Sequence, residues 1–514
     1  MKNYFYPFLS ALCLCFIFFS CDLDDDLQVI ETTSQTELIN KKNVLKESFG
    51  FALVNSLTQS QTLRETIKEE ALKMFNKDYE VLVYSILDKR LENGKTFEQQ
   101  INSYASNKFT LQSLLDLEPT LTILVPELPM NTFSAEQWDA TNEVPAIAIR
   151  TNTTNEIPLI TPENEIGMIP NDAIPGFPVL VIKNNERVIS NIENINYNDF
   201  KTRIVYEKNG VEFKFWSDSF DNEKSETHLQ RSTINIDQVL EDAYNIYEQD
   251  NPGLNGWQRD YVYYGIQPSN PNGPFKYDFQ EHIRSFGMTG NAMNAYNKIS
   301  DQTGDPRYNN NHRINTSHWT GGFYEFKVRT VINAKNGVGN ELINGFTVRP
   351  SELFHLDYET YTTGWWFWKK TWYRLKNIYN KTILIDIPII NWDLDEYASS
   401  IKIEIEEVDL TTKTTITDTR TVKFATNFQI SPSLGEKIKL GLKFGASLET
   451  TQTHTVQKSF TEGNDFLGEA IVNFADKVIL GRKRLGFGGR RWYTRDYTTG
   501  LGYCKFSVEP KRVQ

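Results

Sequence analysis

Aromatic side chains crowd one short stretch of this sequence and offer flat surfaces for binding. The stretch begins at a glycine and combines aromatic residues with two lysines, namely Gly364, Trp365, Trp366, Phe367, Trp368, Lys369, Lys370, Trp372 and Tyr373. Because alternate residues of a strand point to opposite faces, Trp366, Trp368 and Trp372 share one side. Exposed rings of this kind stack on sugars or lie at a membrane interface, and the lysines bind phosphates or acidic sugars. Buried rings would instead fill the ends of a sandwich, so solvent exposure separates binding from packing.

A basic, glycine-rich stretch near the C-terminus is the second candidate site. Its cationic residues are Arg482, Lys483, Arg484, Arg490 and Arg491, and Gly486, Gly488 and Gly489 lie between them. Glycine lets backbone amides approach a ligand, and paired arginines bind phosphate or carboxylate. The spacing is not that of a P-loop or a dinucleotide fingerprint. The stretch is either a solvated loop or a surface that rests against lipopolysaccharide phosphates. If it adjoins the tryptophan run, the two form one binding face.

The residue types that catalysis needs do not form a known spacing. The six histidines are scattered without an HExxH pattern, and no G-x-S-x-G elbow occurs. Two acidic groups offer oxygen ligands for calcium, but neither supplies a full set: Asp301 with Asp305, and Asp393 with Asp395 and Glu396. We therefore expect no cofactor and no metal. A glycosidase needs two facing carboxylates, and 66 acidic residues do not select a pair.

Cys21 is the candidate for a covalent lipid. The mostly apolar run from residue 4 to residue 19 fits a signal peptide, because it is shorter than the roughly 20 apolar residues that a bilayer crossing needs. Ser20 and Cys21 resemble the lipobox of bacterial lipoproteins, in which the thiol is acylated and the preceding peptide is removed. The acidic run Asp22, Asp24, Asp25 and Asp26 resembles the surface-export signal of Bacteroidota lipoproteins. This resemblance, confined mainly to the N-terminal stretch, implies a lipid-anchored protein of the outer membrane, exposed at the cell surface.

Charge and cysteine content agree with an exported chain that is stabilised by packing. The net charge is -12, but residues 431 to 514 carry 14 basic and 8 acidic residues, a net of +6. That last segment is the part suited to an anionic partner, although we expect no nucleic acid because the charge is local. Only Cys504 remains outside the N-terminal stretch, so we expect no intramolecular disulfide.

The pattern of apolar residues divides the chain into five segments. We expect a signal peptide over residues 1–20, an acidic flexible tether over 21–45 and a helical region over 46–118, in which residues 79–91 continue the helical period. Residues 119–250 form a mixed β-rich segment with a hairpin over 178–189 and a closing helix over 235–249. Residues 251–514 form a β-sandwich. The predicted fold class is α+β.

The clearest strands lie in this last segment. Ile383, Ile385, Ile387 and Ile389 share one face of a strand that Pro388 assigns to a sheet edge, and the isoleucines at 401, 403 and 405 alternate with charged residues. Such half-buried strands without intervening helices are typical of an antiparallel sandwich. Residues 438–448 alternate over the longest stretch. With the threonines that follow, they resemble the amphipathic hairpins of aerolysin-type pore-forming toxins, which implies membrane insertion. An ordinary sandwich strand whose lysines face water gives the same pattern and is favoured over the pore.

These observations favour a binding or interaction module over an enzyme. The expected partners are the membrane, through the lipid on Cys21, and a glycan, envelope component or protein. A secreted hydrolase with unidentified carboxylates is the main alternative, and an aerolysin-like pore-forming protein is the third.

Overall fold

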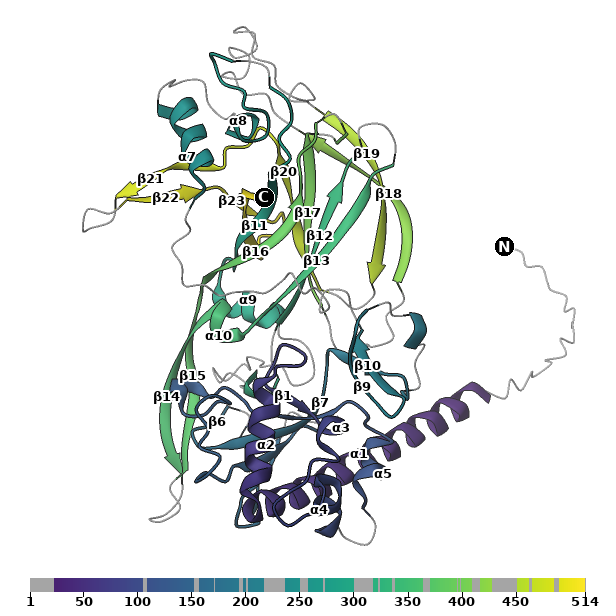
Figure 1. Ribbon diagram of the computed structural model, residues 1–514. Coiled ribbons are helices and arrows are strands. Elements are labelled where there is room, and N and C mark those ends of the chain that lie inside the picture. Colours follow the sequence, from purple (N-terminus) through teal and green to yellow (C-terminus); the bar gives the residue numbers. More distant parts are fainter. Residues whose placement is uncertain are drawn as a thin grey trace, which may run out of the picture.

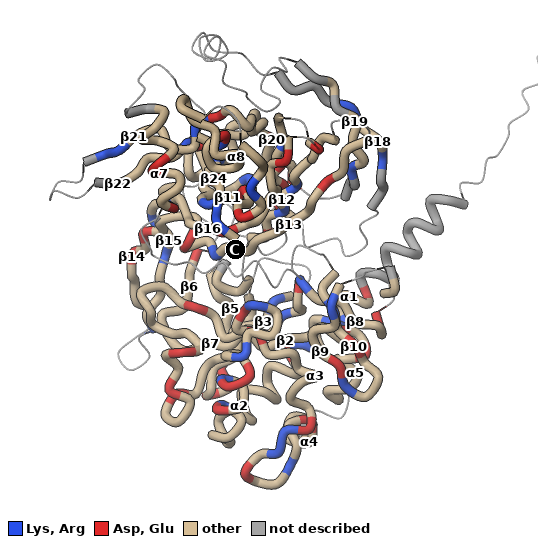
Figure 2. Tube along the Cα trace, turned by 45° about the horizontal axis from the view of Figure 1, so that its top comes forward, with Lys and Arg blue, Asp and Glu red and all other residues tan. Residues whose placement is uncertain are grey.

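The computed structural model describes residues 23 to 513 with internal gaps, and the described elements form two halves (Figure 1). The gaps are residues 105–108, 152–156, 171, 194–196, 200–201, 217–235, 250–257, 271–272, 300–317, 322–323, 335–337, 364–369, 395, 398, 409–416, 428–450, 462–464 and 485–489, and no side chain is described for residues 23–36. Helices and a mixed sheet make up the first half, and antiparallel sheets dominate the second. Acidic and basic residues are distributed over both (Figure 2). The α+β fold class is confirmed.

A six-stranded sheet is the framework of the N-terminal half. Its strands are, in spatial order, β1 (Glu80–Leu82), β2 (Leu121–Leu124), β7 (Val179–Asn184), β3 (Ala146–Ile149), β4 (Ile157–Ile160) and β5 (Ile166–Ile169). Neighbours pair antiparallel except β3 and β7, which are parallel. The central strands are continuous runs of buried apolar residues, as expected where both faces of a sheet are covered.

Helices pack around this sheet. The long α1 (Leu23–Gln59) lies against β3 and β4, and its Phe49 and Leu53 are fully buried. Ser60 separates it from α2 (Gln61–Leu72), and the Ser60 hydroxyl caps α2 by accepting a hydrogen bond from the backbone N–H of Leu63. Three short helices follow: α3 (Val83–Ile86), α4 (Phe97–Ser103) and α5 (Leu111–Leu115).

Two predictions for this half differ from the structure. The predicted tether over 21–45 lies largely within α1, because no proline or glycine interrupts the chain between Leu23 and Gly50. The predicted helical pattern over 79–91 contains strand β1, whose Val81 and Leu82 pair with β2. Periodicity alone does not separate a short buried strand from a buried helix, so tertiary pairing decides here.

The predicted hairpin over 178–189 is wrong in a way that matters for function. Strand β7 pairs with β2 and β3, whereas β8 (Val188–Ser190) joins a second sheet with β10 (Val211–Phe215) and β9 (Ile204–Lys208). Residues 185–187 therefore connect two sheets. Their side chains make ion pairs and hydrogen bonds that a tight turn would not need.

Two four-stranded antiparallel sheets enclose the core of the C-terminal half. One has the order β16 (Thr382–Ile390), β11 (Phe279–Met288), β24 (Cys504–Arg512) and β23 (Asp496–Thr498). The other has the order β13 (Asn340–Val348), β12 (Tyr324–Ile332), β17 (Ser400–Glu407) and β20 (Asp465–Asn473). The Phe286 ring of β11 lies 4.9 Å from Phe326 of β12 and 5.0 Å from Phe346 of β13, so aromatic rings join the two sheets. The predicted sandwich is confirmed.

The predicted strand that contains Pro388 is β16, and it lies at a sheet edge with its four isoleucines buried. The strand over 401–405 is β17, but both of its faces are covered rather than one. Glu404 and Glu406 on its second face are buried, and Arg329 of β12 lies 3.0 Å from Glu406. The charged face of β17 can be buried because its glutamates form ion pairs with Arg329.

Several elements extend from the sandwich. β14 (Phe354–Thr363) and β15 (Lys370–Asn380) pair along their length and reach the N-terminal half, where β15 pairs with β6 (Ile174–Pro175) (Figure 1). β18 (Thr417–Asn427) pairs with β19 (Thr451–Thr461), and β21 (Ile479–Arg484) pairs with β22 (Arg490–Thr494). The helices of this half are α7 (Gln238–Tyr244), continued by η3 (Asn245–Gln249), α8 (Gln258–Tyr264), α9 (Ala292–Lys298) and α10 (Pro350–Leu353). The predicted closing helix corresponds to α7 and η3.

The alternating stretch 438–448, which suggested membrane insertion, lies outside the described residues. Within the described part of the chain, no helix combines the length and the apolar character that a bilayer crossing requires.

Candidate functional site

The first sequence candidate, the aromatic run, is described only at its C-terminal end. Trp365, Trp366, Trp368 and Lys369 lie outside the described residues, as does Cys21. Trp372 belongs to β15 and is 7% exposed. Its ring packs edge-on against Phe177 at 5.2 Å, and its indole N–H donates to the Thr363 hydroxyl at 2.8 Å. As a correction to the expected platform, Trp372 is a core residue and does not present its ring to a ligand.

The second candidate forms the β21–β22 hairpin. Arg482 and Arg484 lie on β21, and Arg490 and Arg491 lie on β22, where Arg484 pairs with Arg490 across the ladder. The hairpin packs on α7 through Trp492, whereas the strands that flank the tryptophan run pair with β6 of the N-terminal half. Figure 1 shows β21 and β22 on the C-terminal half and β14 and β15 extending toward the N-terminal half, so these described strands do not lie side by side.

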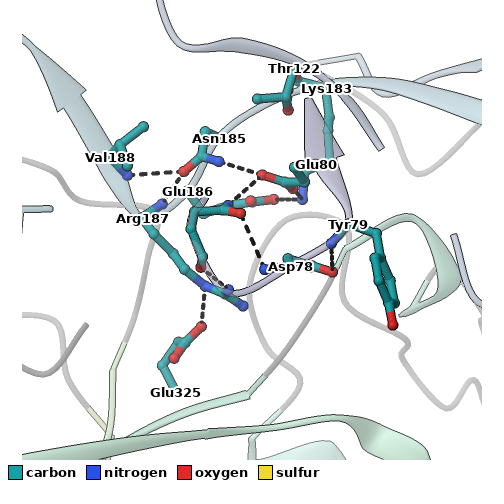
Figure 3. A network of polar contacts seen from close by, with 11 residues as sticks. Asp78, Tyr79, Glu80, Thr122, Lys183, Asn185, Glu186, Arg187, Val188 and Glu325 are labelled. Carbon is teal, nitrogen blue, oxygen red and sulfur yellow. Dashed lines mark hydrogen bonds and ion pairs between the residues drawn. The ribbon is translucent and has the colours of Figure 1, made fainter. Parts of the chain in front are cut away.

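The structure instead brings together a buried polar cluster between the two halves, which the sequence did not reveal (Figure 3). Glu80 of β1 accepts from Lys183 at the end of β7, with Nζ 2.9 Å from Oε1. Arg187 reaches across to Glu325 of β12, and its Nε lies 2.6 Å from Oε1. All four side chains are at least nine-tenths buried. An ion pair thus joins the N-terminal sheet to the sandwich.

Amide side chains complete this cluster. Asn76 donates to Glu80 at 2.7 Å, and Asn185 donates to the same carboxylate oxygen. The Asn185 side-chain oxygen accepts from the backbone N–H groups of Arg187 and Val188 at 2.9 and 3.0 Å. These bonds hold the connection between β7 and β8 in the one shape that directs Arg187 at Glu325.

Burial dominates the electrostatics of the cluster. It raises the pKa of Glu80 to about 7 despite the neighbouring Lys183. It also raises the pKa of Glu325 to about 7 despite Arg187, and it raises the pKa of Asp78. Burial would lower the pKa of Lys183, but the Glu186 and Glu80 carboxylates outweigh it and keep that pKa above its ordinary value. The cations therefore stay charged, while the Glu80 and Glu325 carboxyls are poised to take up protons near neutral pH.

A cavity of about 260 Å³ adjoins the cluster and is lined by both halves. The N-terminal half contributes Asp78 and the segment from residue 124 to residue 131, which includes Glu127, and the C-terminal half contributes Trp319, Arg349 and Tyr358. Glu127 and Arg349 form an ion pair across the cavity wall. The Arg349 guanidinium also lies 5.5 Å from the centre of the Tyr79 ring. Burial raises the pKa of Glu127 to about 7.

Two residues of the cavity wall have strained backbone. Among the described residues six non-glycine residues have a positive φ, and Met130 and Asn131 are two of them. Met130 and Asn131 line the cavity with φ values of 57° and 55°, and the Met130 side chain is 76% exposed. Residues other than glycine adopt this conformation at a cost, and such strain is frequent where a protein binds a ligand.

The lining combines hydrogen-bond acceptors, donors and rings in a small space. Asp78 and Glu127 supply carboxyl oxygens, Arg349 supplies a guanidinium, and Trp319 and Tyr358 supply aromatic faces. Trp319 is 4% exposed, and its indole N–H has no hydrogen-bond partner among the described residues. Within the described part of the chain no group of three His, Cys, Asp or Glu residues is arranged to hold a metal ion. The calcium candidates Asp301, Asp305 and Asp395 lie outside it.

Comparison with known proteins adds no relative: no family model, no curated protein and no solved structure matches this chain. One signal of the buried polar cluster was present in the sequence, since Asp78 and Glu80 lie at the start of a buried strand, Lys183 lies near the end of another, and Arg187 follows in the next connection. No sequence pattern indicated that Glu325 of β12, in the other half, would be the partner of Arg187.

Proposed function

We propose that this protein is a lipid-anchored binding module of a bacterial cell surface, and that the cavity between its halves binds a neutral, hydroxyl-rich ligand such as the terminal sugar of a glycan. The lipobox resemblance at Cys21 and the acidic run after it support the location. The composition of the cavity wall is the observation that supports the ligand class.

Charge favours a neutral ligand. Glu127 and Arg349 compensate each other directly as an ion pair, and burial raises the pKa of Asp78, which favours its neutral form. A strongly charged ligand would meet no single uncompensated charge of opposite sign. Hydroxyl groups both donate and accept, so they match a wall that offers carboxyl oxygens beside guanidinium N–H groups.

Size and aromatic content favour a single sugar ring. The cavity is smaller than the roughly 300 to 1,000 Å³ of sites for drug-sized ligands. Tyr358 is half-buried and supplies an apolar face of the kind that packs on sugar rings. A chain end fits this volume better than the middle of a polymer, because a polymer needs an open groove.

A blocking substitution tests the ligand site. Ser351 lines the cavity on α10 and is exposed, so Ser351→Trp should fill the cavity without disturbing the core. On an array of immobilised neutral and acidic saccharides, we expect the wild-type chain to bind neutral ends and the variant to lose at least tenfold in affinity. Ser103→Trp, at an exposed position of α4, is the matched control and should bind normally. Equal binding by Ser351→Trp, or a silent array, contradicts the proposal.

The anchor is tested separately. Metabolic labelling with palmitate in a bacterial host should tag the wild-type chain and not Cys21→Ser. Label that persists on Cys21→Ser refutes lipidation at this thiol but leaves the cavity argument intact.

One observation favours hydrolysis as a second candidate. Asp78 and Glu127 line the same cavity, and a carboxyl with a pKa of about 7 suits a general acid. Release of free sugar from a bound saccharide, lost in Glu127→Gln while binding remains, would support an enzyme rather than a binding module.

A further inference from the structure

The β21–β22 hairpin carries a concentration of positive charge that the cavity does not use. Between residues 479 and 494 the sequence has five basic residues and no acidic residue: Arg482, Lys483, Arg484, Arg490 and Arg491. The hairpin projects from the body of the molecule (Figure 1) and carries basic residues along β21 (Figure 2). Arg482 and Lys483 are exposed and make no ion pair with any described residue.

One side of the hairpin fixes it to the body. Trp492 packs edge-on against Tyr244 of α7 at 5.2 Å, and its indole N–H donates to Glu241 at 2.7 Å. The Arg482 guanidinium lies 3.9 Å over the Trp492 ring, and its Nη2 donates to Asn245 at 3.3 Å. These contacts attach the hairpin to α7 and η3, and the exposed Arg482 is held by a cation–π contact rather than by a carboxylate.

The remaining exposed residues combine charge with apolar surface. Lys483 Nζ lies 4.5 Å from the centre of the Tyr493 ring, and that ring is 45% exposed. Leu480, near the start of β21, is 38% exposed. Tyrosine beside lysine and arginine is typical of protein surfaces that lie at the headgroup level of a membrane.

We propose that the β21–β22 hairpin docks on a membrane surface rich in anionic, phosphate-bearing lipid headgroups. Arg482 and Lys483 contact the phosphates, and Tyr493 and Leu480 lie at the boundary with the acyl chains. This inference concerns a different surface from the cavity and does not depend on the ligand proposed there. If a lipid on Cys21 holds the chain at a membrane, the hairpin supplies a second, reversible contact that orients the body.

The expected strength follows from charge. Each Lys or Arg near an anionic surface contributes about a fivefold gain in partitioning. Replacing two of them, in Arg482→Gln/Lys483→Gln, should therefore weaken binding roughly 25-fold. Salt should weaken the wild-type interaction as well, because the contacts are solvent-exposed.

Cosedimentation with lipid vesicles tests the proposal on the full chain carrying Cys21→Ser, so that no lipid anchor contributes. Vesicles of phosphatidylcholine are compared with vesicles that also contain phosphatidylglycerol. The difference between the two compositions cancels any contribution of the apolar N-terminal run. We expect binding that requires phosphatidylglycerol, declines with salt and falls about 25-fold in the double variant.

The matched control removes the same charges elsewhere. Arg90→Gln/Lys95→Gln replaces one arginine and one lysine at exposed positions of the N-terminal half. This control should bind the anionic vesicles like the parent chain. Equal loss in both double variants would attribute binding to net charge alone and overturn the proposal. Equal binding to neutral vesicles, or hairpin-dependent binding to a single-stranded oligonucleotide without binding to the anionic vesicles, would overturn it too.

Discussion

The ion pair between Arg187 and Glu325 should be the contact on which the association of the two halves depends most. Arg187 is 6% exposed in its side chain and Glu325 is 2% exposed, so removal of one partner leaves a charge that water does not reach. Breaking a buried pair in this way typically costs about 3 to 5 kcal/mol. Arg187→Met additionally loses the 3.0 Å hydrogen bond from Nη1 to the Asn76 carbonyl.

The two single substitutions should differ in their free-energy cost, because only one of the two partners can neutralise its buried charge by changing its protonation state. In Arg187→Met the remaining Glu325 carboxyl takes up a proton, which its pKa of about 7 already favours. In Glu325→Leu the guanidinium cannot lose its proton. We therefore expect Arg187→Met to cost about 3 kcal/mol near pH 7 and less at pH 6, and Glu325→Leu to cost more than Arg187→Met at both pH values.

Urea unfolding followed by tryptophan fluorescence measures this, because Trp319 lies in the cavity wall between the halves. The double variant Arg187→Met/Glu325→Leu should recover much of the loss and give a coupling of about 2 kcal/mol. Lys505 and Asp496, an exposed pair at 2.7 Å, are the control, and their removal should cost less than about 1 kcal/mol. Additive effects of Arg187 and Glu325, each as small as those of the control pair, would refute the idea that this contact joins the halves.

Three further predictions follow from the same structure. Glu325→Gln should flatten the pH dependence of stability. The folded carboxyl has a pKa of about 7 against an ordinary 4.5, so between these pH values the folded chain holds more protons than the unfolded chain. In urea titrations, wild-type stability should therefore fall by about 3 kcal/mol as the pH rises through this range. Met130→Gly should raise stability by up to about 1 kcal/mol in the same assay, because glycine relieves the positive φ of an exposed side chain, and a loss of stability would contradict the strain argument. Arg259→Met should cost about 3 to 5 kcal/mol, since it strands the fully buried Glu281, which Arg259 contacts at 2.7 and 3.1 Å; a cost below about 1 kcal/mol would show that the sandwich does not need this pair.

Local patterns in the sequence were sufficient for much of the sandwich. The isoleucines of β16 alternate strictly, and Pro388 cannot donate a ladder hydrogen bond, so both the buried face and the edge position followed from the chain itself. The second face of β17 was mispredicted because Glu404 and Glu406 look solvent-exposed until Arg329 is found beside them. The alternation of apolar residues along a strand shows which face the strand can bury, but it does not show which neighbouring elements cover the other face.

The site itself depends on contacts that no local pattern encodes. The sequence predicts a turn at Lys183 and a returning strand that begins at Arg187, yet their partners Glu80 and Glu325 come from distant strands. The tryptophan run gave the opposite error at Trp372, where an aromatic residue suited to binding is a packed core residue. Charged and aromatic side chains serve binding and packing equally well, and burial alone separates these roles.

The position of the cavity links ligand binding to the contact between the halves. Its walls come from both, so the ligand that we propose would bind fully only where Arg187 and Glu325 hold the halves together. A ligand at a hundredfold excess over its Kd stabilises the form it binds by about 2.7 kcal/mol, close to the loss expected for Arg187→Met. The apparent affinity of that variant should therefore fall in proportion to the fraction of molecules whose halves remain associated. Added ligand should restore much of its stability. A ligand that binds wild type and Arg187→Met with equal affinity would mean that one half alone forms the site.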